Sequence, residues 1–285
     1  MAVTNSLSIC SYNMFGYRNG LSMIDELCNN HNIIAIQEHW LREEELVKLS
    51  RLHSDFNSWG ASGMNSTLSI TILKGRPFGG VGFLWHNSIS NMIMPLGSSC
   101  DGRCIALKLH ILNLEILIFN VYFPCFDNGA EYKDDITVLC AFMESCLIGT
   151  QHSDVIIMGD TNFDIVPNHT GFSILNSLLS SWNLEPCDNL VVGYSDAPSS
   201  PKCITHTYVN EALNQSSRID HFFVSTRLKA HVLSASVIDC PAINMSDHRP
   251  IDIIIDLFSI SGSAAGTICL PSGMGKQSTC APQRL

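Results

Sequence analysis

Short apolar runs alternate with longer amphipathic stretches along this chain. The short runs are rich in isoleucine, valine, leucine and phenylalanine, and several are flanked by glycine, asparagine or proline, which is typical of β-strands. They predict strands over residues 7–11, 33–37, 80–85, 105–110, 115–122, 154–158, 218–224 and 251–257.

The amphipathic stretches predict helices over residues 20–30, 41–52, 131–147 and 170–182. In the third of these, apolar residues that include Ile136, Leu139 and Met143 make one broad face. Asn168 and Thr170 are candidate N-caps of the fourth helix. Strands interspersed with helices predict an α/β fold in which two sheets pack together and helices cover their outer faces.

The alternation ends after residue 257, where glycine, serine and proline become frequent. Such a composition is typical of a flexible tail or linker. The chain shows no internal repeat. We therefore expect one domain over residues 1–258 and a flexible tail or linker over residues 259–285.

The composition is typical of an intracellular globular protein. Hydrophobic residues make up 46% of the 285 residues and charged residues 15%, unlike a disordered chain. The polar N-terminus does not resemble a secretory signal, and no apolar run approaches the roughly 20 residues of a membrane-spanning helix. The 12 cysteines are scattered without a Cys-x-x-Cys pair, which favours a reduced compartment over disulfides or a zinc cluster. We expect a soluble protein, nuclear or cytoplasmic, not secreted and without a membrane partner.

The net charge of −10 bears on the choice of partner. A protein that binds nucleic acid mainly through phosphate contacts is usually basic. Any activity on nucleic acid must therefore rest on a local site, where metal ions offset the negative charge.

Polar side chains stand at the ends of several predicted strands. Asp160 and Asn162 follow the run 154–158, and Gly159 lets the backbone turn so that both side chains can point toward a ligand. Other strand ends carry Asn13, Glu38, Tyr122, Asp220, Asp247 and His248. Each alone could be a turn, a solvated strand end, a core tyrosine or a surface histidine. Four further histidines lack ligand spacing and are interpreted as structural: His39, His86, His206 and His221.

Taken in order, these strand ends resemble the endonuclease/exonuclease/phosphatase superfamily. The matching pieces are Tyr12-Asn13, Gln37-Glu38, Asn120-Val121-Tyr122-x-Pro124, Gly159-Asp160-x-Asn162, Arg218-Ile219-Asp220-His221 and Ser246-Asp247-His248. The resemblance implies a four-layered α/β/β/α sandwich of two mixed sheets with helices on the outer faces. It also implies hydrolysis of phosphodiesters or phosphomonoesters with Mg²⁺, or with Mn²⁺ as the alternative metal.

Two further segments, residues 33–41 and 79–83, are similar to the apurinic-type endonuclease domain of non-LTR retrotransposons. Those domains nick target DNA to prime reverse transcription. The similarity implies a DNA substrate and an endonuclease product with a 3′-hydroxyl. It leaves open whether a reverse transcriptase domain belongs to the parent element, and we expect a monomer.

The chemistry of phosphoester hydrolysis suggests a role for each residue that matches the family. A phosphodiester repels nucleophiles and has a poor leaving group, so it needs a positioned water and charge neutralisation. Glu38 is expected to be the main metal ligand, with Asn13 and Asp247 completing the coordination directly or through water. Asp160 is expected to orient or deprotonate the attacking water, and Asn162 to hold Asp160 or to bind the phosphate.

The remaining matches are expected to contact the substrate. His248 would contact a non-bridging phosphate oxygen while Asp220 orients its imidazole. Tyr122 would donate to the phosphate or lie near the leaving group, and Thr207 matches a family threonine at the substrate groove. The expected catalytic residues are Asn13, Tyr122, Asp160, Asn162, Asp220 and His248, and the expected substrate-binding residues are Tyr122, Asn162 and Thr207.

The chain departs from the family pattern at two positions. Cys125 stands where many relatives carry asparagine, and Phe15 stands where many DNA-repair members carry an acid. Both departures argue against an abasic-site repair enzyme and are compatible with a nicking enzyme. Residues 208–217 are predicted to form a hairpin beside the groove and, as in retrotransposon relatives, to influence target choice.

Two alternatives stay open. The same fold could act on a phosphoinositide, a sphingolipid or RNA, which the acidic charge favours and the absence of a basic cluster in the sequence disfavours. The chain could also be a catalytically inactive, retroelement-derived interaction module, although all six motifs are present.

Overall fold

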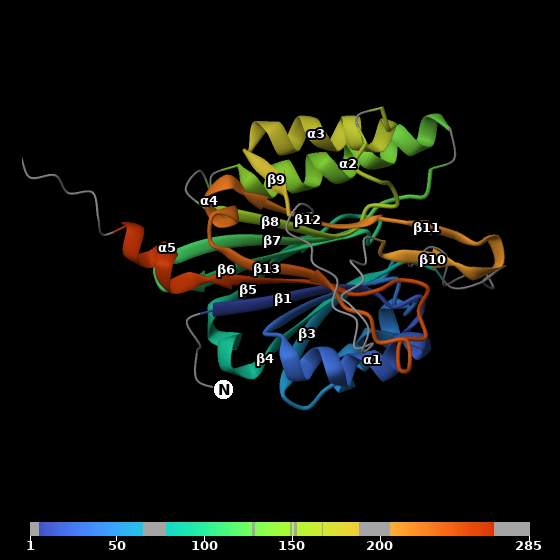
Figure 1. Cartoon of the computed structure of the whole chain (residues 1–285), viewed down its shortest axis with the longest axis horizontal. Helices are drawn as coiled ribbons and strands as arrows, with labels where there is room; N and C mark the ends of the chain where they lie inside the picture. Colours follow the sequence, from blue (N-terminus) through green and yellow to red (C-terminus); the bar gives the residue numbers. More distant parts are fainter. Residues whose placement is uncertain are drawn as a thin grey trace, which may run out of the picture.

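The computed structural model describes residues 6–64, 78–126, 129–148, 150, 153–166, 168–187 and 206–264. Two six-stranded sheets stack face to face, and helices cover their outer faces (Figure 1). This arrangement confirms the predicted four-layered α/β/β/α sandwich.

The first sheet has the strand order β13-β14-β1-β2-β4-β3. Only β1 and β2 run parallel within it, so the sheet is mixed. Its strands are β1 (Ser6–Asn13), β2 (Ile33–Gln37), β3 (Phe56–Ala61), β4 (Val81–His86), β13 (Val232–Val237) and β14 (Ile251–Asp256).

The second sheet has the order β5-β6-β7-β8-β12-β9, with β7 and β8 as its parallel pair. Its strands are β5 (Ile93–Ser98), β6 (Cys104–Ile111), β7 (Leu114–Tyr122), β8 (Asp154–Asp160), β9 (Leu184–Pro186) and β12 (Asp220–Ser225). A separate two-stranded hairpin, β10 (Tyr208–Asn210) and β11 (Gln215–Ser217), projects at one end and confirms the predicted hairpin.

The outer layers are helical. Helix α1 (Tyr17–Asn30) lies against the first sheet, and α2 (Ala130–Leu147) and α3 (Thr170–Ser181) cover the second (Figure 1). Shorter helical elements are the 3₁₀ helices η1 (Glu43–Arg51), η3 (Asn87–Met92) and η5 (Glu211–Leu213), and the α-helices α4 (Thr226–Lys229) and α5 (Leu257–Ala264). No helix among the described residues is long and apolar enough to cross a membrane.

Three of the four helix predictions are confirmed, and three details differ from the predictions. The predicted helix over residues 41–52 is the 3₁₀ helix η1. The N-cap of α3 is His169, whose side chain accepts a hydrogen bond from the amide of Gly171, and neither Asn168 nor Thr170 caps the helix. Helix α5 takes in the first residues of the predicted tail, and residues 265–285 lie outside the described part of the chain.

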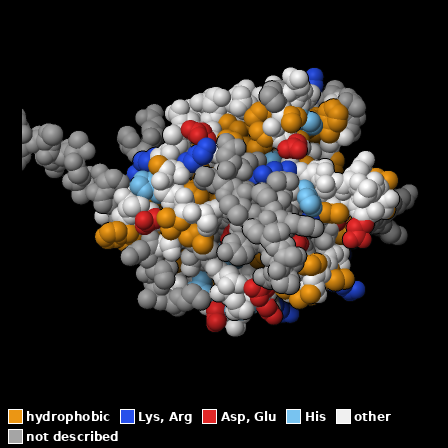
Figure 2. Space-filling model, viewed as in Figure 1, with side chains coloured by type: hydrophobic (Ala, Val, Ile, Leu, Met, Phe, Trp, Pro, Cys, Tyr) orange, Lys and Arg blue, Asp and Glu red, His pale blue; other side chains and the backbone are white. Residues whose placement is uncertain are grey.

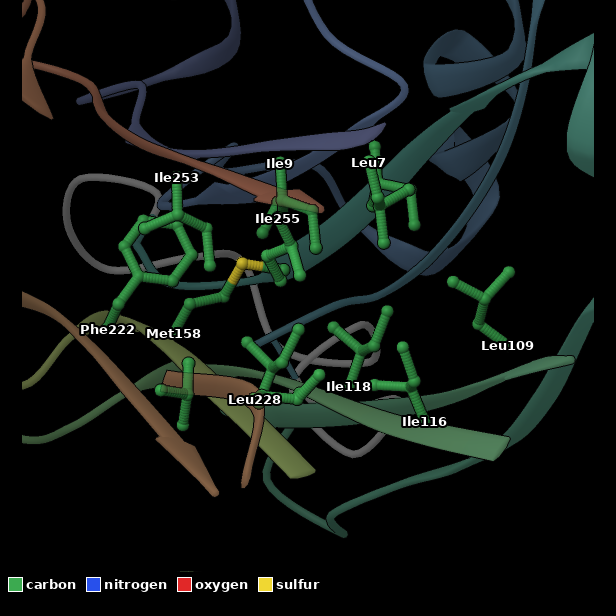
Figure 3. Close-up of a cluster of buried hydrophobic side chains, with 14 of the residues drawn as sticks. Leu7, Ile9, Leu109, Ile116, Ile118, Met158, Phe222, Leu228, Ile253 and Ile255 are labelled. Atoms are coloured by element: carbon green, nitrogen blue, oxygen red, sulfur yellow. The ribbon is translucent and has the colours of Figure 1, made fainter. Parts of the chain in front are cut away.

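The alternation of side chains along each strand explains the layers. In β1, Leu7 and Ile9 face the second sheet, while Cys10 and Tyr12 pack toward α1. Figure 3 shows the inner layer, where isoleucines of β1 and β14 point toward residues of β7, β8 and β12. Side chains alternate between the two faces of a strand, so Asn13, four residues after Ile9, lies on the same inner face. The strand ends therefore carry polar groups into the gap between the sheets.

Candidate active site

The strand ends meet at one edge of the sandwich because of the strand directions. Asn13 pairs with Gln37 across the parallel strands β1 and β2. In the second sheet, Tyr122 pairs with Asp160 across the parallel strands β7 and β8. Asp160 also pairs with Asp220, the first residue of the antiparallel strand β12. Four carboxyl ends and the start of β12 thus place their polar residues together.

Asn13 joins the two sheets within this cluster. Its Nδ2 donates to Glu38 Oε1 at 3.1 Å and to Asp160 Oδ2 at 2.8 Å. Its Oδ1 accepts a hydrogen bond from the amide of Phe15 at 2.9 Å. The side chain is fully buried. One amide group therefore fixes two carboxylates that come from opposite sheets.

Asp160 is buried at the centre of the cluster. Burial raises its pKa to about 7; the charge of His248 opposes this shift, and the charge of Asp220 adds to it. Besides the contact with Asn13, Oδ1 accepts a hydrogen bond from the backbone amide of Asn162 at 2.8 Å. Asp160 is thus a carboxyl group held in place by two neutral donors.

His248 and Asp220 form a buried pair beside Asp160. The Nδ1 of His248 lies 2.8 Å from Asp220 Oδ2, and its Nε2 lies 3.8 Å from Asp160 Oδ2. Burial lowers the pKa of His248, but the charges of Asp220 and Asp160 outweigh burial and raise it to about 10. The imidazole is therefore a cation, with Nδ1–H donated to Asp220 and Nε2–H facing Asp160.

Asn162 lies at the mouth of the site in the left-handed region, with φ 55°. Its Nδ2 donates to the carbonyl of Phe123 at 2.7 Å, and the exposed thiol of Cys125 donates to its Oδ1 at 3.3 Å. Burial, with the charges of Asp160 and Glu38, raises the pKa of the Cys125 thiol, which keeps it a hydrogen-bond donor. Cys125, the first departure from the family pattern, thus touches a predicted site residue directly.

Glu38 also has a left-handed backbone, with φ 52°. Its Oε2 accepts a hydrogen bond from Trp40 Nε1 at 2.9 Å, so each carboxylate oxygen has one donor. Left-handed backbone at non-glycine residues costs on the order of 1–3 kcal/mol and is retained where the surroundings over-determine it. Here the hydrogen bonds on both carboxylate oxygens supply part of that constraint.

Two sets of groups could hold a divalent cation. The ligand atoms of Asp160, Asp220 and His248 lie within 4.8 Å of one another, but Asp220 and His248 are already paired by a hydrogen bond. The second set is the carboxylates of Glu38 and Asp247. Asp247 Oδ1 is buried and has no hydrogen-bond partner among the described residues, and the charge of Glu38 acts on this carboxyl, so the donor set fits a divalent cation. Asn13 turns its NH₂ group, which donates and cannot bind a metal, toward Glu38. In this orientation Asn13 supports the Glu38 carboxylate.

Tyr122 and Arg103 form the opposite wall. The guanidinium of Arg103 lies 5.2 Å from the centre of the Tyr122 ring and 3.7 Å from Asp101. Arg103 Nη1 is buried without a hydrogen-bond partner among the described residues. Burial and the charges of Glu38 and Asp160 raise the pKa of Tyr122, so its phenol stays protonated and can donate.

Sequence reasoning missed Arg103. The residue precedes β6, whose amino end lies beside the carboxyl end of β7 because the two strands are antiparallel. The available signal was a Gly102-Arg103 turn immediately before a predicted strand. A cation at that strand end was as informative as the acids at the others.

Thr207, His39 and His221 are buried and form hydrogen bonds with the backbone. Thr207 is fully buried, and its hydroxyl accepts hydrogen bonds from the amides of Ile219 and Asp220, so it supports the start of β12. His39 and His221 are buried, with ring nitrogens that contact backbone carbonyls, as expected of structural histidines. On the face shown in Figure 2, Lys and Arg occur in small groups and do not form one basic patch.

A buried amide pair lies one layer below the site. Gln37 Nε2 donates to Asn120 Oδ1 at 2.7 Å, and Asn120 Nδ2 donates to the carbonyls of Ile36 and Gly82. Gln37 belongs to the first sheet and Asn120 to the second. The pair therefore fixes the spacing of the sheets directly under the cluster.

Comparison with solved structures identifies the same fold. The AP endonuclease LMAP from Leishmania major matches with a TM-score of 0.66 and 14% identity over 88% of each chain. The 3′ phosphatase NExo from Neisseria, bound to a product DNA hairpin, matches with a TM-score of 0.62 and 16% sequence identity. The match covers 88% of this chain and 99% of that one. A mannosyl-6-phosphatase from Bacteroides thetaiotaomicron matches with a TM-score of 0.59 and 17% sequence identity. The match covers 87% of this chain and 99% of that one.

A family model covers most of the chain, whereas a search of curated protein sequences finds no match. The model of the Endonuclease/Exonuclease/phosphatase family matches residues 10–248, which include the predicted site residues from Asn13 to His248. Because the family match covers most of the sandwich and all the predicted site residues, the chain belongs to the Endonuclease/Exonuclease/phosphatase family.

Proposed function

We propose that this chain is a Mg²⁺-dependent endonuclease that nicks DNA and leaves a 3′-hydroxyl, of the type found in non-LTR retrotransposons. The observation that carries the proposal is the bridge from Asn13 to both Glu38 and Asp160, with Nε2 of His248 3.8 Å from Asp160. It combines a metal-binding carboxylate, a water-orienting carboxylate and a cationic histidine in one site.

Asp160 is assigned to the attacking water. The amides of Asn13 and Asn162 hold its two oxygens, so the carboxylate can receive a water proton in a fixed orientation. Asn162 reaches the mouth of the site and is placed to steady the phosphate as well.

His248 is assigned to the phosphate. Its Nε2–H faces the site while Asp220 holds Nδ1, so the imidazolium can donate to a non-bridging oxygen and offset its charge. Tyr122 and Arg103 offer a phenol donor and a second cation on the other wall.

The oxygen donors of Glu38 and Asp247 suit Mg²⁺, with Mn²⁺ as the alternative. When bound there, the ion would supply Lewis-acid neutralisation of charge on the phosphate and the leaving oxygen. Asn13 donates to both Glu38 and Asp160, so it fixes the distance between the metal-binding carboxylate and the water-orienting carboxylate.

Nicking of ordinary DNA is favoured over abasic-site repair by Phe15 and Cys125, which replace the acid and the asparagine of repair relatives. A parent element with a reverse transcriptase domain, an intracellular location and action as a monomer belong to the same proposal. Target preference is assigned to the hairpin of β10 and β11, where Val209 N donates to the carbonyl of Asp247, next to His248.

A phosphatase or phosphodiesterase acting on a lipid head group or RNA is the second candidate. Its supporting observation is the acidic net charge of −10, which a duplex-binding protein would need to offset locally. The third candidate, an inactive interaction module, is opposed by the complete set of site contacts described above.

Nicking of supercoiled plasmid with Mg²⁺ tests the proposal. Wild type is expected to produce open circles whose 3′ ends a DNA polymerase extends without prior phosphatase treatment. Asp160→Ala and His248→Ala should abolish nicking, whereas the exposed controls Asp55→Ala and His110→Ala should not. Equal, background activity of wild type and both site variants would reject the proposal, and phosphate release from lipid substrates alone would establish the second candidate.

A further inference from the structure

The indole of Trp40 lies against the carboxylate proposed as the main metal ligand. Trp40 Nε1 donates to Glu38 Oε2 at 2.9 Å, and Asn13 Nδ2 donates to Oε1 at 3.1 Å. Both donors are neutral, so they orient the carboxylate while leaving its negative charge to attract a cation. A lysine or arginine in the same place would orient the carboxylate but also compete with the cation for its charge.

The position of Trp40 is itself tightly constrained. Its backbone is left-handed, with φ 55°, and its amide donates to the carbonyl of Gly79 at 3.0 Å. Its ring covers Gly16, where an added Cβ would lie 2.5 Å from Trp40 Cε3. Phe15 packs edge-on against the indole, with ring centroids 5.2 Å apart. These contacts hold the indole with its N–H toward Glu38.

Phe15 gains a physical reason from this packing. Phe15 replaces an acid found in many repair relatives. Its ring packs against Trp40 from the loop that follows β1. An acid at this position would add charge beside Glu38 and remove the ring contact. Phe15 thus supports the residue that donates to the Glu38 carboxylate.

We propose that Trp40 is a positioning residue for the divalent cation, acting through Glu38. The inference rests on the proposed metal site. Hydrogen bonds to metal-binding side chains orient the ligand, and their loss typically weakens metal affinity about 10- to 100-fold. Trp40→Phe keeps a ring over Gly16 and beside Phe15 but removes the N–H donor, so it isolates this effect.

Binding of Mn²⁺ to the full chain, followed by electron paramagnetic resonance of the free ion, measures the effect without requiring turnover. Trp40→Phe is expected to weaken Mn²⁺ binding about 10-fold. The control Trp182→Phe, at the far end of α3, should bind as wild type does. The Mg²⁺ concentration for half-maximal nicking should rise in parallel in Trp40→Phe, with the rate at saturating Mg²⁺ less affected.

Fluorescence gives a second measurement that uses the folded wild-type protein. Bound Mn²⁺ should quench Trp40, and Mg²⁺ should reverse the quenching. The quenching should persist in Trp182→Phe and vanish in Trp40→Phe. Quenching that Trp182→Phe removes would overturn the assignment.

The outcomes separate the two levels of the proposal. If Glu38→Gln abolishes Mn²⁺ binding but Trp40→Phe binds as tightly as wild type, the role of Trp40 is rejected and the metal site stands. If Glu38→Gln binds as wild type does, the metal site is elsewhere and both assignments fail. Plasmid nicking by wild type tests the enzyme activity independently of either result.

Discussion

Asn13 and Asp160 belong to different sheets, and a 2.8 Å hydrogen bond between them links the two sheets at the edge where the site lies. The same Asn13 amide reaches Glu38 at 3.1 Å. The separation of the two carboxylates is therefore set by a single side chain.

Replacement of that side chain should impair both folding and activity. Asn13→Ala leaves the buried Asp160 without one donor, which is expected to lower the free energy of unfolding by about 1–3 kcal/mol. Nicking should fall more than this loss of stability explains, because Glu38 and Asp160 lose their common support. Chemical denaturation and plasmid nicking at a temperature where the variant is folded distinguish the two effects. An active Asn13→Ala with only its stability reduced would contradict the proposed coupling.

The Asp220–His248 pair predicts a loss confined to the chemical step. Asp220→Asn keeps the size of the side chain but removes the charge that supports the imidazolium, so nicking should fall about 100-fold or more. Single-turnover rates together with DNA-binding measurements would show the drop in rate with binding retained. The exposed Asp55→Asn serves as the matched control. A variant with unchanged single-turnover rate would remove Asp220 from the proposed machinery.

Arg103 predicts a phosphate contact. Arg103→Ala should weaken DNA binding and reduce the slope of log affinity against log salt by about 1, because one phosphate contact is lost. Arg103→Lys should recover only part of the effect, since an ammonium does not reproduce the planar stacking on Tyr122. Fluorescence anisotropy across a salt series measures both. Lys133→Ala, on the outer helix α2, should leave the slope unchanged, and an equal slope in Arg103→Ala would exclude the contact.

The cap of α3 predicts a stability difference between neighbouring residues. His169→Ala removes the acceptor for the amide of Gly171 and should lower the free energy of unfolding by about 1 kcal/mol. The ring contact of His169 with Phe163 adds to that loss. Asn168→Ala should have little effect, because Asn168 is exposed and does not cap the helix. Urea denaturation of the two variants side by side tests the assignment, which fails if Asn168→Ala is the more destabilised.

The strands that the apolar pattern predicted are the central ones, and those it missed are the edges. The missed strands are β3 and β13 of the first sheet and β5 and β9 of the second. Most central strands are largely buried and read as apolar runs, as β2 and β8 do. Edge strands are shorter or more polar: β5 carries Pro95 and a shift of register at Gly97. Their pairing depends on neighbours distant in sequence, which no local pattern encodes.

The chemistry of the site divides in the same way. Side-chain parity along a strand is a local property, so the acids, amides and histidine at the strand ends, from Asn13 to His248, could be identified from the sequence with the family resemblance. Arg103 also stands at a predicted strand end, but the roles of Arg103 and Trp40 depend on side-chain contacts that the sequence does not give. The stacking of Arg103 on Tyr122 and the hydrogen bond from Trp40 to Glu38 exist only once the turns are folded.

For Thr207, the sequence predicted a role but not the contacts that the residue makes. Its place in the motif order predicted a groove residue, and in the folded protein it is buried, with a hydroxyl that accepts hydrogen bonds from the amides of Ile219 and Asp220 at the start of β12. The linear pattern thus determined the layers and the central strands, since these follow from period and burial, and the family resemblance implied most of the reactive groups. The tertiary structure alone decided which oxygen meets which donor, because hydrogen-bond partners are selected by distances of a few ångströms between segments far apart in the chain.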